Sequence, residues 1–184
     1  PILAAQARRI PLDMLDAGNN GPEGMAYDAR EDVLYIAKER KPTALYALEG
    51  VLAGGPVRQR DRSDWLRSLA FATDLSSLEF DPVTRHLLLL SDESQLIAEI
   101  TLDGRPVSTR SLHRDGWQLP VPQAEGIAVD AQGTLLGSFS VMGLDQAPGY
   151  GEIGYWVARE ARGRGVASRA VTLLRDWAAV ELGL

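Results

Sequence analysis

Glu23-Gly24-Met25-Ala26-Tyr27-Asp28 is a phrase that recurs more loosely as Ser76-Ser77-Leu78-Glu79-Phe80-Asp81 and then as Glu125-Gly126-Ile127-Ala128-Val129-Asp130. The copies lie about 50 residues apart, and each ends on an aspartate. After the first two copies come a turn-like run and a β-forming run, residues 33–37 and 86–90. A repeat of this length with several short strands per unit is typical of a β-propeller or a similar array.

The repeat does not extend over the whole chain. Residues 70–112 have the pattern of one nearly complete four-stranded blade, residues 20–60 that of most of another, and residues 120–135 that of the first strand or two of a third. Beyond these units a different pattern begins. We therefore predict two domains: a partial β-propeller over residues 1–134 and a separate segment over residues 135–184.

The C-terminal segment combines strands with a helix. Residues 136–142 and 151–157 have the composition of strands, and an amphipathic helical pattern follows Gly165. Gly183 is placed to end that helix. The predicted fold class is mainly β with a C-terminal α/β segment, in which partial propeller blades precede a strand-strand-helix unit. The expected apolar face of the helix consists of Val166, Ala170, Leu173, Leu174, Trp177 and Ala178.

Composition excludes several classes of protein. Of the 184 residues 45% are apolar and 24% are charged, as in ordinary globular proteins. The net charge of −6 argues against a nucleic-acid binder. The absence of cysteine excludes disulfides and thiolate sites and favours a cytoplasmic location, with a periplasmic one open if a targeting segment was removed. No apolar run approaches the roughly 20 residues of a membrane helix, so we expect no membrane segment.

Four phrases in the first part of the chain occur in the order of a known family. They lie at residues 22–28, 35–39, 89–93 and 122–130. Through them, about residues 8–134 resemble the SdiA-regulated family of β-propellers. That resemblance implies a fold similar to phytase-type or esterase-like propellers.

The last part carries a second resemblance, over about residues 134–184. Residues 151–157 and the loop Arg162-Gly163-Arg164-Gly165-Val166-Ala167 are similar to the fourth strand and the Gln/Arg-x-x-Gly-x-Gly/Ala signature of the GNAT acetyltransferases. The resemblance implies acetyl-CoA as cofactor, a small-molecule amine as acceptor, and Glu152 as a catalytic acid that assists deprotonation of the amine. The implied cofactor-binding residues are Tyr155, Trp156, Val157, Arg162, Gly163, Arg164, Gly165, Val166 and Ala167.

Each of these residues also has a structural interpretation. The loop leads into a helix whose free backbone N–H groups favour an anion, and its glycines let a diphosphate approach. A solvated, arginine-rich helix start is the alternative. Glu152 is equally well explained as a surface glutamate. Tyr155 and Trp156 suit a core as well as a wall of the cofactor site.

Five acids recur near strand ends around the repeated phrases. Because inner strands and their loops face the axis of a propeller, we expect these acids to converge, with Lys38 as a counter-ion. Clustered carboxylates bind Ca²⁺ or raise one another's pKa. In the alternative interpretation each acid caps a turn within its own blade. The candidate metal ligands are Glu23, Glu39, Asp92, Glu93 and Glu125.

Other polar and aromatic residues favour structural roles. His86 and His113 lack the spacing of metal ligands and are expected at the surface. Trp65 and Trp117 are expected to pack between blades. The charged residues 57–64 predict a surface connection.

Three functional hypotheses follow. The first is an acetyl-CoA-dependent N-acyltransferase segment fused to a propeller module and incomplete as an enzyme. The second is a propeller that binds a ligand or calcium, with the C-terminal segment completing its packing. The third is a chimera with no single evolved function. Exposed β edges also predict association into a homo-oligomer.

Overall fold

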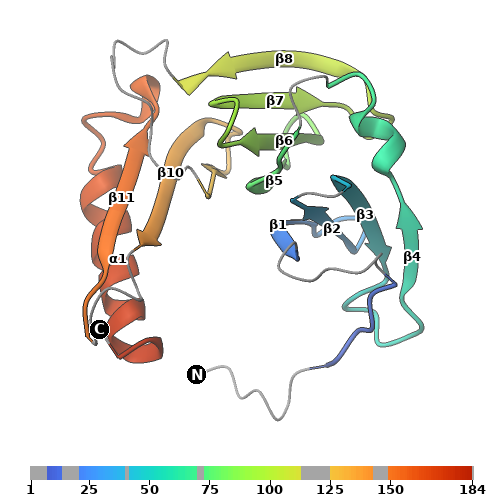
Figure 1. Cartoon of the computed structure of the whole chain (residues 1–184), viewed down its shortest axis with the longest axis horizontal. Coiled ribbons are helices and arrows are strands. Elements are labelled where there is room, and N and C mark those ends of the chain that lie inside the picture. Colours follow the sequence, from blue (N-terminus) through green and yellow to red (C-terminus); the bar gives the residue numbers. More distant parts are fainter. Residues whose placement is uncertain are drawn as a thin grey trace.

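The computed structural model describes residues 8–13, 21–39, 42–69, 73–112, 125–142 and 149–183. Within them the chain forms three antiparallel sheets and one long helix, so the expectation of a mainly β chain is confirmed (Figure 1). None of the described helices is long and apolar enough to span a membrane.

The first sheet has the strand order β1-β2-β3-β4, and consecutive strands pair antiparallel. Apolar residues of β2 and β3 are buried on both faces, whereas the side chains of β4 are mostly exposed. The predicted surface connection over residues 57–64 is therefore wrong in part, because the free edge of β3 pairs with this charged run. The strands are β1 (Pro22–Asp28), β2 (Val33–Lys38), β3 (Ala44–Glu49) and β4 (Arg58–Asp61).

The second sheet repeats this plan with the order β5-β6-β7-β8. A short 3₁₀ helix, η2 (Ser63–Leu66), lies in the connection between the sheets. The strands are β5 (Ser77–Asp81), β6 (His86–Ser91), β7 (Leu96–Ile100) and β8 (Pro106–Ser111). The four strands that the sequence pattern over residues 70–112 predicts are thus confirmed as one antiparallel sheet.

The third sheet has three strands, in the order β11-β10-β9. β9 (Ala128–Val129) belongs to the last copy of the repeated phrase, whereas β10 (Leu135–Met142) and β11 (Glu152–Val157) belong to the C-terminal segment. One sheet therefore contains strands from both sides of residue 134. The division into two domains at that residue stays a prediction.

A 3₁₀ turn, η4 (Arg159–Ala161), leads from the third sheet into helix α1 (Val166–Glu181). The helix is confirmed, but its expected apolar face is only partly covered. Ala178 is buried, whereas Leu173 is 70% exposed and Trp177 is 49% exposed. Among the described elements, α1 packs mainly against β10 and β11, and these contacts leave both side chains exposed.

The three sheets lie around a common centre, with the first strand of each on the inside and the later strands outside (Figure 1). β1 contacts β5, and β5 contacts β9. Gly24 permits the close contact of β1 with β5, because a Cβ on this residue would lie 2.6 Å from the backbone nitrogen of Leu78. This arrangement agrees with blades of a partial propeller.

Apolar clusters fill the spaces between neighbouring sheets. One joins the first two sheets and includes Leu45 and Leu89, and another joins the last two and includes Leu90 and Trp156. The inter-blade role of Trp65 is confirmed, since its side chain packs on Tyr35 of β2 and against the β7–β8 hairpin. His113 and Trp117 lie outside the described residues. Association through β edges stays a prediction.

Candidate functional site

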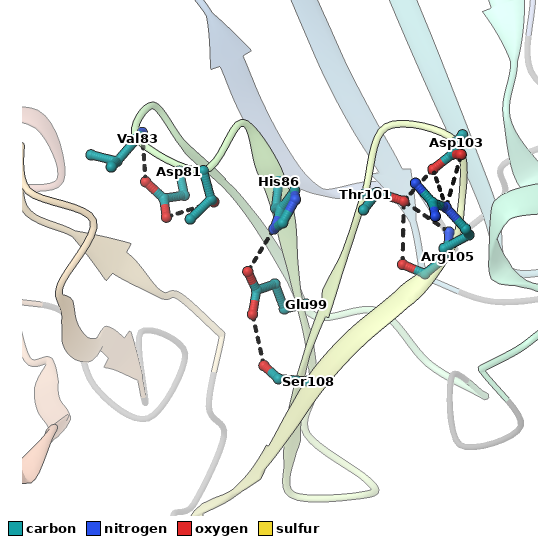
Figure 2. Close-up of polar contacts among 9 residues, drawn as sticks. Asp81, Val83, His86, Glu99, Thr101, Asp103, Arg105 and Ser108 are labelled. Carbon is teal, nitrogen blue, oxygen red and sulfur yellow. Dashed lines mark hydrogen bonds and ion pairs between the residues drawn. The ribbon is translucent and has the colours of Figure 1, made fainter.

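The inner strands end on the aspartates of the repeated phrase, which cap the turns that follow. Asp28 Oδ1 accepts a hydrogen bond from the backbone N–H of Arg30 at 3.0 Å. Asp81 Oδ1 accepts one from Val83 at 2.8 Å, as Figure 2 shows. Asp130 caps the third turn in the same way. The aspartates that define the repeat therefore fix the turns at one end of the inner strands.

Four of the five predicted acids gather at the opposite end of these strands. Glu23 lies at the start of β1 and Glu125 lies just before β9, whereas Glu39 and Asp92 follow the antiparallel neighbours β2 and β6. Burial, together with the charges of Glu39 and Glu125, raises the pKa of Glu23 above its ordinary value. Burial, together with the charges of Asp92 and Glu39, raises the pKa of Glu125. Acids from all three sheets thus lie close enough to repel one another.

The fifth acid has a different neighbour. The side chain of Glu93 is exposed and accepts a hydrogen bond from Thr73 Oγ1 at 3.4 Å.

Lys38 is only 1% exposed, and its Nζ donates to the carbonyl oxygen of Pro42 at 3.2 Å. Its role as a counter-ion to the acids stays a prediction.

The acid-lined end does not form a ready metal site. Within the described part of the chain, no group of three or more His, Asp or Glu residues is placed to hold a metal ion. Calcium takes six to eight oxygen ligands at about 2.3–2.6 Å, which a preformed site would supply. The residues therefore do not fit directly coordinated calcium.

At the turn end of the inner strands the three sheets line an open cavity of about 410 Å³. No pattern in the sequence predicts this cavity, although residues near the end of all three repeated phrases line it. Its walls contain an ion pair in which the half-buried Arg85 Nη2 donates to the buried Asp28 Oδ2 at 2.7 Å. The lining residues are Tyr27, Asp28, Ala29, Arg30, Glu79, Phe80, Pro82, Arg85, Val129, Asp130 and Ala131.

The candidate residues on β11 divide between core and surface. Trp156 is 4% exposed and packs between the second and third sheets, where the guanidinium of Arg110 lies 5.8 Å from its ring centre. Tyr155 is 55% exposed and stacks on Phe139. Glu152 is exposed at the start of the strand. Their catalytic and cofactor-binding roles stay predictions.

The predicted cofactor loop is an exposed turn before α1. Gly163 and Gly165 have φ angles of 73° and 71°, and no atom lies within 4 Å of the point where a Cβ on Gly163 would lie. Arg162 Nε donates to the carbonyl oxygen of Val157 at 3.0 Å. Arg164 pairs with Asp130 at 3.3 Å and so ties this turn to the end of the third repeated phrase. Val166 and Ala167, partly buried, begin the helix.

His86 belongs to a polar chain across the second sheet (Figure 2). Its Nδ1 lies 2.7 Å from Glu99 Oε1, and Ser108 Oγ donates to Glu99 Oε2 at 2.7 Å. The carboxylate thus stands between the serine and the histidine. In a catalytic triad the histidine lies beside the nucleophilic serine, so these three side chains do not form a triad. They link β6, β7 and β8 across the sheet.

The comparison with protein families agrees with the repeat and with the strand plan. The family model described as SdiA-regulated matches residues 1–137, which is well over half of the chain. The match includes both four-stranded sheets and the last copy of the repeated phrase. The chain therefore belongs to the SdiA-regulated family.

Proposed function

We propose that this chain is a propeller-type binding module that takes up a cation at the acid-lined end of its inner strands. The observation that carries the proposal is the mutual repulsion of Glu23, Glu39 and Glu125, which two separate sheets bring together. Repulsion among neighbouring carboxylates is a cost in free energy that a bound cation relieves.

The arrangement favours a cation held by charge over one held by direct coordination. Because the described acids lack the geometry of a metal site, the preferred ligand is an organic polycation or a hydrated divalent ion. Spermidine and Ca²⁺ represent these two cases. Both are expected to bind through Glu23 and Glu125.

The test is a thermal-melt titration at constant ionic strength, because salt screens exposed charges. A ligand that binds only the folded chain raises the melting temperature, by the equivalent of about 2.7 kcal/mol at a hundred times its dissociation constant. We expect spermidine to raise the melting temperature of the wild type. We expect Glu23→Gln/Glu125→Gln to lose most of that rise.

The matched control is Glu181→Gln, which makes the same chemical change at the exposed end of α1. Because both acids of the site have raised pKa values in the folded state, their ionised forms destabilise the chain at pH 7. The double variant should therefore be more stable without ligand, and a lost response cannot be ascribed to unfolding. Equal responses in the double variant and the control would refute the proposal.

A second candidate is acetyl-CoA binding at the turn before α1. The observation that favours it is the open backbone of Gly163, which follows a strand and precedes a helix as in the resembling acetyltransferases. Arg162 and Arg164 would bind the diphosphate and Glu152 would assist deprotonation of an amine acceptor. Acetyl-CoA supplies the activated acetyl group when it is bound.

The same titration separates the two candidates. Acetyl-CoA should raise the melting temperature of the wild type and not that of Arg162→Ala/Arg164→Ala if the turn binds the cofactor. Arg175→Ala, which changes an exposed arginine elsewhere on α1, is the control. Absence of a shift at millimolar acetyl-CoA would leave the cation-binding module as the function of the chain.

A further inference from the structure

The cavity at the turn end of the inner strands lies away from the acids of the proposed function. Its volume of about 410 Å³ is within the range of small-molecule sites. The walls come from all three sheets, because Tyr27 and Phe80 precede the last residues of β1 and β5, and Val129 ends β9. Three blades thus shape one concave site that a compact ligand can enter.

Most charged groups in the walls are already compensated by neighbours. Asp28 is 1% exposed and binds Arg85, whose guanidinium also lies 5.7 Å from the ring centre of Phe80. Arg30 pairs with Glu31 at 3.5 Å. Asp130, on the opposite wall, pairs with Arg164. These groups give the cavity its shape and polarity but leave little unbalanced charge.

Glu79 is the exception. Its Oε1 accepts a hydrogen bond from the N–H of Phe80 at 3.2 Å, and none of the ion pairs among the described residues includes it. Burial raises the pKa of this carboxyl, and no neighbouring charge contributes to the shift. The carboxyl therefore stands in the wall without a cation to balance it.

We propose that this cavity binds a compact amine-bearing ligand whose ammonium group pairs with the Glu79 carboxylate. An ammonium group supplies the missing positive charge and donates hydrogen bonds to the carboxylate. Pro82, Val129 and Ala131 offer apolar contacts to the rest of the ligand. The site is independent of the acid-lined end, since it uses none of Glu23, Glu39 or Glu125.

The experiment measures binding of benzylamine and benzyl alcohol by calorimetry. The two compounds share a ring and differ in the charge of one group. A charge-assisted hydrogen bond corresponds to about a tenfold difference in affinity, so benzylamine should bind the wild type about tenfold more tightly. Glu79→Gln should remove that preference. Equal affinity of the wild type for both compounds would overturn the proposal.

Two further variants locate the site. Ala131→Trp, at an exposed lining residue, should weaken both compounds because the indole fills the cavity. Glu23→Gln/Glu125→Gln should leave benzylamine affinity unchanged, which separates this site from the proposed cation site. Benzylamine affinity that is unchanged in Glu79→Gln, or lost in the Glu23/Glu125 variant instead, would refute the assignment.

The pH dependence gives a readout that a purely structural glutamate would not change. The charged groups lining the site with Glu79 are Asp28, Arg30, Arg85 and Asp130. Since the pKa of Glu79 is raised, benzylamine affinity should increase as pH rises through that pKa and the carboxyl ionises. Glu79→Gln should abolish this increase. A wild-type increase that persists in the variant would contradict the pairing.

Discussion

Replacing Gly137 with alanine is expected to lower the free energy of unfolding by more than about 3 kcal/mol. Gly137 has a φ of 152°, and a Cβ there would lie 2.0 Å from the carbonyl oxygen of Trp156. The residue pairs with Val157 on one side and with Ala128 on the other. A displaced β10 would therefore break the third sheet along both edges, and urea denaturation would show the loss.

Gly163→Ala is the matched control. Gly163 also has a positive φ, of 73°, but a Cβ at this residue would have no atom within 4 Å. Only backbone strain opposes this change, which costs about 1 kcal/mol. A loss in Gly137→Ala no larger than that in the control would show that β10 and β11 are not packed as described.

The second large effect is expected from Asp28→Ala. Asp28 is 1% exposed, and its carboxylate binds the guanidinium of Arg85 and the N–H of Arg30. Removing it leaves the turn N–H without its acceptor and takes from the half-buried guanidinium its nearer carboxylate, the other being Glu31 at 3.7 Å. Breaking such a pair costs about 3 kcal/mol. The change should appear as a lower midpoint of urea denaturation.

Asp130→Ala tests whether burial is the cause. Asp130 is the equivalent residue of the third repeat and caps the same turn, but its partner Arg164 is 51% exposed. Because solvent screens the exposed pair, this variant should lose clearly less stability than Asp28→Ala. If the two losses were equal, burial of the Asp28 carboxylate would not be the cause of the larger effect.

The repeated phrase allowed much of the fold to be predicted. Its alternating apolar residues indicated the inner strands, and the turn chemistry after each aspartate indicated the hairpins. The strand β4 could not be found in this way. Its residues, Arg58–Asp61, are charged because the outermost strand faces solvent, so no apolar alternation marks it.

The two ends of the inner strands were not equally predictable. The acids at one end stand beside the repeated phrases, and the antiparallel order of β1 and β2 brings Glu23 near Glu39. The cavity at the other end depends on how β1, β5 and β9 lie relative to one another, and no pattern in the sequence predicts that arrangement. Glu79 lies within the second repeated phrase, and no sequence motif marks it as a functional residue. Only its burial distinguishes it from a surface glutamate.

The C-terminal segment shows a further limit of sequence patterns. Its loop Arg162–Ala167 has a specific local signature, which suggests an independent unit. In the structure, however, strand β10 of this segment pairs with β9 of the last repeated phrase. A local signature carries no information about strand pairing over long distances. The pairing of β9 with β10 therefore emerged only from the structure.

The convergence of acids at one end of the inner strands can be tested through the pKa of Glu125, followed by carboxyl ¹³C NMR in the wild type and in Glu39→Gln. Burial, together with the charges of Asp92 and Glu39 from the other two sheets, predicts a pKa above the ordinary value of 4.5 in the wild type. The same arrangement predicts a lower pKa in the variant, because one of the neighbouring charges is gone. A wild-type pKa at the ordinary value, or one that Glu39→Gln leaves unchanged, would contradict the convergence of the blades on one site.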